Sequence, residues 1–222
     1  MSDEINWEPQ SVADLATQLS RIGNDYRSAI ADVYSAFNSI GLEQKWVGKN
    51  FNIIANEILN TSRGTFEGWS DYLQVTVPRT VYQIAEMQAE RGGGSVSFSL
   101  TPNSVEISNV ENTEEKADGS QRLDATAVRA TLNGVIPTNC QTASTRLQDY
   151  YGQFQELGTL NGNAAILEIY KELDSILGKT RQILETFQDQ VNETAEKSIQ
   201  NTELTNEETI QIANQLAAIL NG

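Results

Sequence analysis

Residues 46–54 read Trp-Val-Gly-Lys-Asn-Phe-Asn-Ile-Ile, and residues 160–167 read Leu-Asn-Gly-Asn-Ala-Ala-Ile-Leu. In both stretches a large apolar residue lies two positions before a glycine, and long amphipathic segments lie on either side. Glycine permits the tight backbone of a turn between two helices. A repeated unit determines the whole architecture. The two turns therefore predict two tandem helical hairpins, which can close on each other as a four-helix bundle.

The segments that flank the turns have the period of an amphipathic helix. In the first segment apolar residues recur every three or four positions over about eight helical turns. They are Val12, Leu15, Leu19, Ile22, Tyr26, Ile30, Val33, Phe37 and Ile40. A helix of this length spans about 45 Å, which is typical of bundles. We expect four long helices, over about residues 9–40, 49–91, 122–157 and 163–199.

Prolines and a capping motif refine this prediction. Pro78 lacks a main-chain N–H and its ring crowds the preceding helical turn, so we expect a kink in the second helix. Gly134 and Pro137 should bend the third helix. Thr205 is followed three residues later by Glu208, which predicts a capping box at the start of a short C-terminal helix. The expected fold is all-α, an elongated four-helix bundle with one short additional helix.

The segment between the two hairpins has a different period. Apolar residues alternate with polar ones on both sides of a Thr-Pro-Asn-Ser turn at residues 101–104; they are Val96, Phe98, Leu100, Val105 and Ile107. This pattern predicts a small β-hairpin in the central linker, followed by an acidic loop. The chain then divides into a first hairpin (1–92), a linker (93–121), a second hairpin (122–200) and a C-terminal helix (201–222).

Charge and apolar patterning narrow the classes of partner. The 222 residues include 15 Lys and Arg against 30 Asp and Glu, a formal net charge of −15. Without a basic stripe to neutralise phosphates, a nucleic-acid partner is not expected. No apolar run approaches the roughly 18 to 20 residues of a spanning helix, so no membrane span is expected. The acidic start, residues 1–4, does not resemble a Sec signal peptide.

The residue inventory argues against catalysis. Histidine is absent, which removes the commonest general base and metal ligand. Cys140 is the one cysteine and lies in an Ala/Thr-rich stretch, where we expect an inert, small apolar residue. The acidic clusters lack the ligand spacing of a calcium-binding EF-hand loop. The sequence therefore predicts a protein that is not an enzyme, with no catalytic residues, no metal site and no cofactor.

The turn at Trp46 and Gly48 resembles that of the WXG family, small helical hairpins exported by type VII (ESX-type) secretion systems. The turn at Leu160 and Gly162 is similar to the leucine variant in the related LXG proteins. The resemblance covers both hairpins, and it implies that these four residues shape the turns and contribute to the export surface. Single-hairpin members dimerise. Here the second hairpin would supply the partner in cis, so we expect a monomer, a fused pseudo-dimer.

The family also carries an export signal, a tyrosine followed four positions later by an acidic residue near the end of the second helix. Tyr82 and Glu86 match this signal in pattern and place, just before the triple glycine at residues 92–94. Tyr170 and Asp174 match the pattern alone. Because Tyr170 belongs to an apolar stripe near the start of its helix, we expect it in the core.

Three features depart from the family: the chain has about twice the usual length, a linker is inserted, and the second turn lacks tryptophan. The leading interpretation is a substrate or carrier exported folded, without a Sec signal. Its partner would be the secretion machinery with its ATPase, or another secreted protein. Two alternatives remain. A helical pore-forming toxin would need a more apolar tongue than the linker offers. A chaperone or adaptor would stay in the cytoplasm.

Overall fold

Long helices follow the apolar stripes. The computed structural model describes residues 8–157 and 163–222. Its elements are α1 (Pro9–Leu42), β1 (Trp46–Val47), α2 (Lys49–Ile54), η1 (Ala55–Asn60), α3 (Thr61–Asp71), η2 (Tyr72–Thr76), α4 (Val77–Arg91), β2 (Arg122–Leu123), α5 (Ala125–Ala130), η3 (Thr131–Val135), α6 (Ile136–Gln155), α7 (Ala164–Ile199) and α8 (Asn206–Asn221). Each η segment is a π-helical turn. The run from α2 to α4 is one continuous helix, here called the second helix, and α5 to α6 form the third helix.

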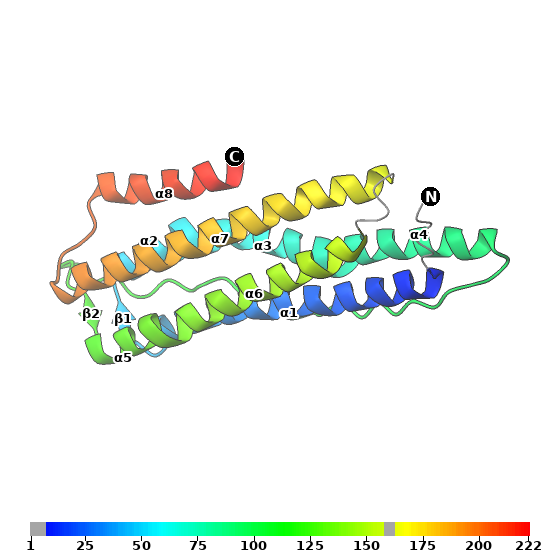
Figure 1. The fold of residues 1–222 in the computed structure, drawn as a ribbon. Coiled ribbons are helices and arrows are strands. Elements are labelled where there is room, and N and C mark those ends of the chain that lie inside the picture. The colour runs from blue at the N-terminus through cyan, green and yellow to red at the C-terminus, as the bar shows by residue number, and fades with distance from the viewer. Residues whose placement is uncertain (1–7, 158–162) are drawn as a thin grey trace.

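These helices form an elongated four-helix bundle (Figure 1). α1 packs against the second helix and against α6, while α7 packs against α6 and against α2. The first hairpin, α1 with the second helix, thus faces the second hairpin, the third helix with α7. The short helix α8 lies outside the bundle and packs on α7 and η1. The predicted all-α class and the bundle of long helices are confirmed.

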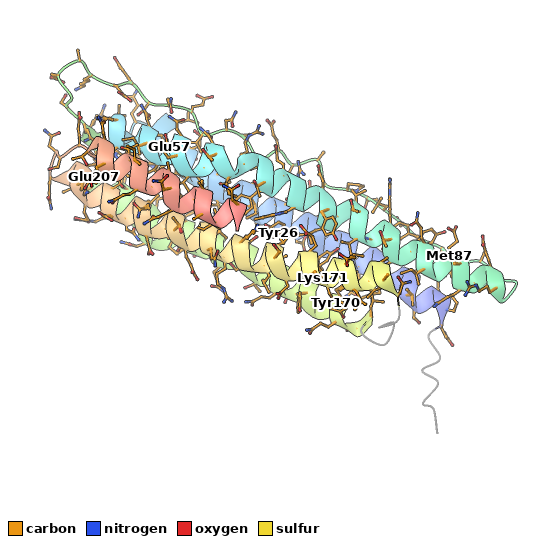
Figure 2. All side chains as sticks on the ribbon, turned by 90° about the horizontal axis from the view of Figure 1, so that it is seen from above. Tyr26, Glu57, Met87, Tyr170, Lys171 and Glu207 are labelled. Atoms are coloured by element: carbon orange, nitrogen blue, oxygen red, sulfur yellow. The ribbon has the colours of Figure 1, made fainter. Side chains whose placement is uncertain are left out.

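The core joins the two hairpins. Phe37 of α1 stacks on Phe51 of α2 with ring centroids 4.7 Å apart, and the edge of Phe187 from α7 meets Phe37 at 5.5 Å. Farther along the bundle, Tyr26 lies between the helices (Figure 2), and its hydroxyl lies 3.0 Å from the hydroxyl of Thr180 on α7. The apolar stripes of the two hairpins therefore bury each other.

Each proline at which we predicted a bend follows a π-helical turn. η2 ends two residues before Pro78, and η3 ends two residues before Pro137. In η2 the Val77 N–H donates to the carbonyl five residues back, and Pro78 has no N–H for the next carbonyl. Hydroxyl groups from other helices supply the donors: Tyr150 donates to the Leu73 carbonyl at 2.7 Å, and Ser20 donates to the Gln74 carbonyl at 2.8 Å.

The predicted β-hairpin of the linker is wrong in its location. Among the described residues, the sheet consists of β1 and β2, paired antiparallel with Trp46 opposite Leu123 and Val47 opposite Arg122. Residues 95–113, here called the strap, contain no strand. They run as an extended segment alongside α1 and the second helix, whose side chains bind its main chain. The two-stranded element exists, but it ties the first turn to the start of the second hairpin.

The strap is extended because the helices bind its main chain. Ile107 and Val110 of the strap are buried, at 0% and 2% exposure. Asn60 on the second helix accepts a hydrogen bond from the Val110 N–H at 2.8 Å and donates to its carbonyl at 3.0 Å. The alternating pattern that suggested strands thus serves an extended segment whose hydrogen-bond partners are helix side chains.

Candidate functional site

The tryptophan of the first sequence-predicted turn is fully buried. Trp46 is 0% exposed, and its ring meets the edges of Phe37 and Phe51. Its indole Nε1–H donates to the hydroxyl of Ser198, in the last turn of α7, at 3.1 Å. The tryptophan therefore does more than close the first hairpin. It holds the end of the second hairpin against the first turn.

Gly48 is required by the backbone of this turn. Its φ of +127° lies in a region that residues with a Cβ atom avoid. A Cβ atom there would also lie 3.0 Å from Cγ of Gln121. The Gly48 N–H donates to the hydroxyl of Thr113 at 2.9 Å, so the turn is also tied to the end of the strap.

A buried carboxamide, which the sequence did not single out, completes the site. Asn50 donates to the Ser198 hydroxyl and to the Thr202 carbonyl, each at 2.9 Å, and accepts from the Leu204 N–H at 2.8 Å. Ser198 thus accepts from both Trp46 and Asn50. Asn50 lies two residues after Gly48, and the apolar pattern of the helix gives no sign of a buried polar residue there. Its hydrogen-bond partners lie about 150 residues away in the sequence.

The other turn residues, Leu160 and Gly162, lie outside the described residues. The helix that follows begins as predicted, because Asn163 is its N-cap and the Asn163 side chain accepts from the Ala165 N–H at 2.9 Å. The role of Leu160 and Gly162 in the second turn stays a prediction.

The proposed recognition pair forms a direct contact. The Tyr82 hydroxyl donates to the Glu86 carboxylate at 3.0 Å on α4. This hydrogen bond raises the pKa of Tyr82, because the neighbouring carboxylate favours the protonated phenol. The Tyr82 ring stacks on Phe98 at 4.7 Å, and Met87 beside the pair is 51% exposed. The Tyr82 hydroxyl and the Glu86 carboxylate are therefore both accessible to a binding partner from solvent. Their role in export stays a prediction.

The second match to the export pattern is used for packing. Tyr170 is partly buried, its hydroxyl donates to the Phe154 carbonyl at 3.1 Å, and the two rings meet edge to face at 4.8 Å. Asp174 is exposed. These contacts agree with the interpretation of Tyr170 as a packing residue.

Cys140 is buried, and burial raises the pKa of its thiol to about 12, so the thiolate that would act as a nucleophile does not form near neutral pH. In the part of the chain that the structure describes, no three acidic or cysteine side chains are grouped to hold a metal ion. No helix among residues 8–157 and 163–222 combines the length and apolar character needed to cross a membrane.

Comparisons of the chain with protein-family models, with curated proteins and with solved structures find no match. The resemblance to WXG and LXG proteins therefore rests on the turn residues in the sequence and, for the first turn alone, on its place between two packed helices.

Proposed function

We propose that the chain is a non-enzymatic protein of the WXG type. It is exported folded by a type VII secretion system, or it carries another secreted protein, as an intramolecular pseudo-dimer. The observation that supports this proposal most directly is the hydrogen bond from Trp46 to Ser198. The tryptophan of the first hairpin turn meets the end of the second hairpin, so one chain supplies the four helices that single-hairpin members obtain by dimerising.

The Tyr82–Glu86 pair supports the export part of the proposal. It lies one helical turn apart on α4, with its hydrogen bond exposed. Figure 1 shows that α4 extends beyond the ends of α6 and α7, so this helix is accessible to a receptor at that end of the bundle. A receptor would bind the Tyr82 ring and the Glu86 carboxylate together, near the C-terminal end of α4 before Gly92.

The decisive experiment compares culture supernatant with cytosol in a bacterium that has a type VII system, with and without its secretion ATPase. We expect the protein in the supernatant when the ATPase is present, and in the cytosol when it is deleted. ATPase-independent release would contradict the proposal. Retention in the cytosol of both strains would instead favour the chaperone or adaptor alternative.

Matched variants separate recognition from folding. Tyr82→Phe removes the hydrogen bond between the pair, and Glu86→Gln removes the negative charge of its acceptor. Because both substitutions keep the ring or the side-chain length, we expect export to fall with an unchanged melting temperature. Tyr170→Phe and Asp174→Asn are the controls, because they change the second match to the pattern and should be exported normally. Normal export of all four variants would leave the WXG resemblance architectural only.

A further inference from the structure

The strap is held in two different ways along its length. Its C-terminal half contains the buried side chains of Ile107 and Val110. Two asparagines of the second helix bind its main chain there: Asn60 at Val110, and Asn52, which accepts from the Thr113 N–H at 2.7 Å and donates to its carbonyl at 3.0 Å. The N-terminal half, residues 95–101, has no fully buried side chain. It therefore depends on hydrogen bonds and on partly buried contacts.

The reversal of the chain at residues 92–94 sets which strap residue lies beside Tyr82. Gly93 in this turn has a φ of +74°. Tyr82 lies ten residues before the turn, which is about 15 Å along the helix. An extended chain covers that distance in four or five residues at about 3.3 Å each, and Phe98 lies four residues after the turn. The chain lengths on the two sides of the turn therefore bring Phe98 level with Tyr82.

Hydrogen bonds from α1 fix the strap on both sides of Phe98. Gln10 accepts from the Ser97 N–H at 3.1 Å and donates to the Ser97 carbonyl at 3.3 Å. Asn24, about four turns farther along α1, donates to the Thr101 carbonyl at 2.8 Å. Residues 96, 98 and 100 are partly buried, whereas 95, 97 and 99 are exposed. The main chain is therefore held so that the Phe98 side chain faces the helices.

The ring of Phe98 stacks on the ring of Tyr82. The ring centroids are 4.7 Å apart, and the angle between the ring planes is 15°. The Tyr82 hydroxyl donates to the Glu86 carboxylate at 3.0 Å. A tyrosine on the surface of a helix can adopt more than one χ1 rotamer, and a single side-chain pair four residues apart restrains it only weakly. The stacked phenylalanine adds a second restraint, which favours the rotamer that brings the hydroxyl to Glu86.

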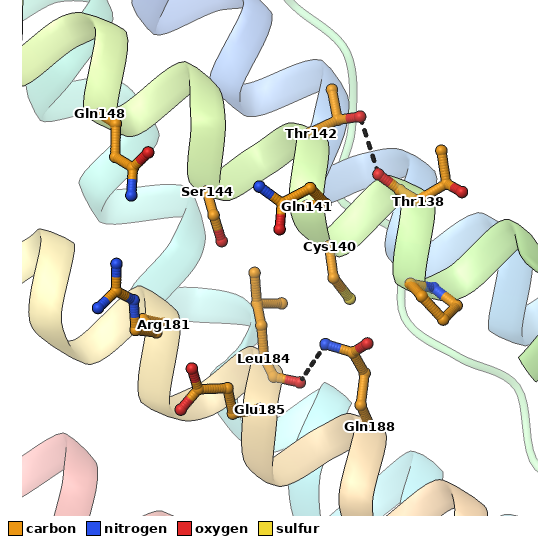
Figure 3. Close-up of a pocket in the computed structure, with 11 residues that line it drawn as sticks. Thr138, Cys140, Gln141, Thr142, Ser144, Gln148, Arg181, Leu184, Glu185 and Gln188 are labelled. Carbon is orange, nitrogen blue, oxygen red and sulfur yellow. Dashed lines mark hydrogen bonds between the residues drawn. The ribbon is translucent and has the colours of Figure 1, made fainter. Parts of the chain in front are cut away.

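The groove between α6 and α7, with a volume of about 600 Å³, shows no comparable arrangement (Figure 3). Arg181 and Glu185 both line it, so its charges select neither an anion nor a cation. Phe98, in contrast, makes a defined contact with one member of the recognition pair.

We propose that Phe98 is a positioning residue of the Tyr82–Glu86 pair. Its ring holds Tyr82 in the rotamer that meets Glu86, and the recognition surface is built from the strap as well as from α4. The inference rests on the proposed function, in which this pair is the export signal. A receptor that needs both groups of the pair therefore binds the chain only after the linker has folded onto the first hairpin.

The first measurement concerns the rotamer and is independent of export. The full-length protein is prepared with ¹³C- and ¹⁵N-labelled tyrosine, and the Tyr82 resonances are assigned by their loss in Tyr82→Phe. Three-bond couplings should give a single χ1 rotamer for Tyr82 in the native chain and averaged values in Phe98→Ala. Phe98→Tyr keeps a stacked ring and should restore the single rotamer. A single rotamer in Phe98→Ala would overturn the proposal.

The second measurement is export in a strain that has the secretion ATPase. Phe98→Ala should lower export at least fivefold, to the level of Tyr82→Phe, while Phe98→Tyr should stay within twofold of the native chain. The matched control is Val105→Ala, which also shortens an apolar side chain of the strap and should be exported normally. Val105 is 41% exposed, and its carbonyl is bound by Arg27, about 25 Å farther along α1 than Gln10. Circular dichroism should show native helix content in all these variants.

The two measurements separate a failure of this inference from a failure of the proposed function. If the native chain is not exported, or if Tyr82→Phe is exported normally, the proposed function fails, and the rotamer alone decides whether Phe98 positions Tyr82. If Phe98→Ala averages the rotamer but leaves export unchanged while Tyr82→Phe lowers it, the inference is wrong. Equal losses of export in Phe98→Ala and Phe98→Tyr would assign the effect to general packing of the strap and would also overturn it.

Discussion

At the scale of single residues, two glycines differ in whether the backbone requires glycine. Gly48 has a positive φ, and Gly68 lies in a regular helix. Gly48→Ala forces a Cβ atom into a positive-φ position, so we expect a loss of about 1–3 kcal/mol in the free energy of unfolding. Gly68→Ala, in the exposed interior of α3 with nothing within 4 Å, should instead gain about 0.5–1 kcal/mol. Urea unfolding measures both. Equal effects of the two substitutions would show that the turn tolerates side chains.

Tyr150 provides a second prediction for a single residue. Tyr150→Phe removes only the hydroxyl that donates to the Leu73 carbonyl, beside Pro78. A buried carbonyl without a donor costs about 1–3 kcal/mol, which we expect as lower stability in urea. Tyr151→Phe is the control, since its partly buried ring forms no hydrogen bond among the described residues. An unchanged stability of the Tyr150 variant would mean that water replaces the hydroxyl.

At the scale of elements, α8 begins in a capping box. Glu208 accepts from the Thr205 N–H, and Lys197 of α7 forms an ion pair with it. The hydrogen bond from Lys197, together with those from Thr205, lowers the pKa of Glu208 to about 2. A carboxyl group whose pKa is lower in the folded state stabilises the fold at a pH above its ordinary pKa. That contribution is lost as the pH falls toward the lowered pKa.

We therefore expect Glu208→Gln to reduce the free energy of unfolding at pH 7, with a difference from the native chain that shrinks as the pH falls from about 4.5 toward 2. The measurement is urea unfolding at several pH values. Glu207→Gln, one residue away and without an ion pair in the described part of the chain, should show no such trend. A difference that is independent of pH would assign the effect to packing.

The structure of the strap predicts that replacing it lowers stability, whereas its polar composition alone predicts little effect. A polar linker is expected to be replaceable by Gly and Ser at little cost, because loop closure depends weakly on length. Replacement of residues 95–113 would instead remove the buried side chains of Ile107 and Val110 and expose the surfaces that they cover. We expect the melting temperature to fall by about 10 °C. A change below about 2 °C would show that the strap contributes no stability.

The elements that the sequence predicted well are those with long apolar periodicity. The stripe from Val12 to Ile40 places nine apolar residues at helical spacing, and the helix follows it. The strap was mistaken for a hairpin because alternation marks any extended segment with one buried side, whichever group binds its main chain. Asn52 and Asn60 could not be recognised as its partners, since an isolated asparagine on a helix is ordinarily solvated. Asn50 and Ser198 meet across about 150 residues of sequence, beyond any local pattern.

At the scale of the whole molecule, the two hairpins bury each other's apolar stripes, and we expect a monomer. Light scattering in dilute solution should give a mass near 24.5 kDa. A mass of twice this value, stable on dilution, would mean that the hairpins pair between chains and that the pseudo-dimer interpretation fails.

The return path of the chain decides how the hairpins are oriented. The second helix ends at one end of the bundle, and the third helix begins at the other, beside Trp46 (Figure 1). A connection of a few residues would start the third helix where the second one ends, and both hairpin turns would then lie at the same end. The second helix, from Lys49 to Arg91, has 43 residues and is about 65 Å long. An extended connection needs about 20 residues to cover that distance. The length of the linker therefore limits how two fused hairpins can pack. With a linker above this length the third helix can start at the end where the first hairpin turns, and with a shorter one it must start at the opposite end, which places both hairpin turns at the same end of the bundle.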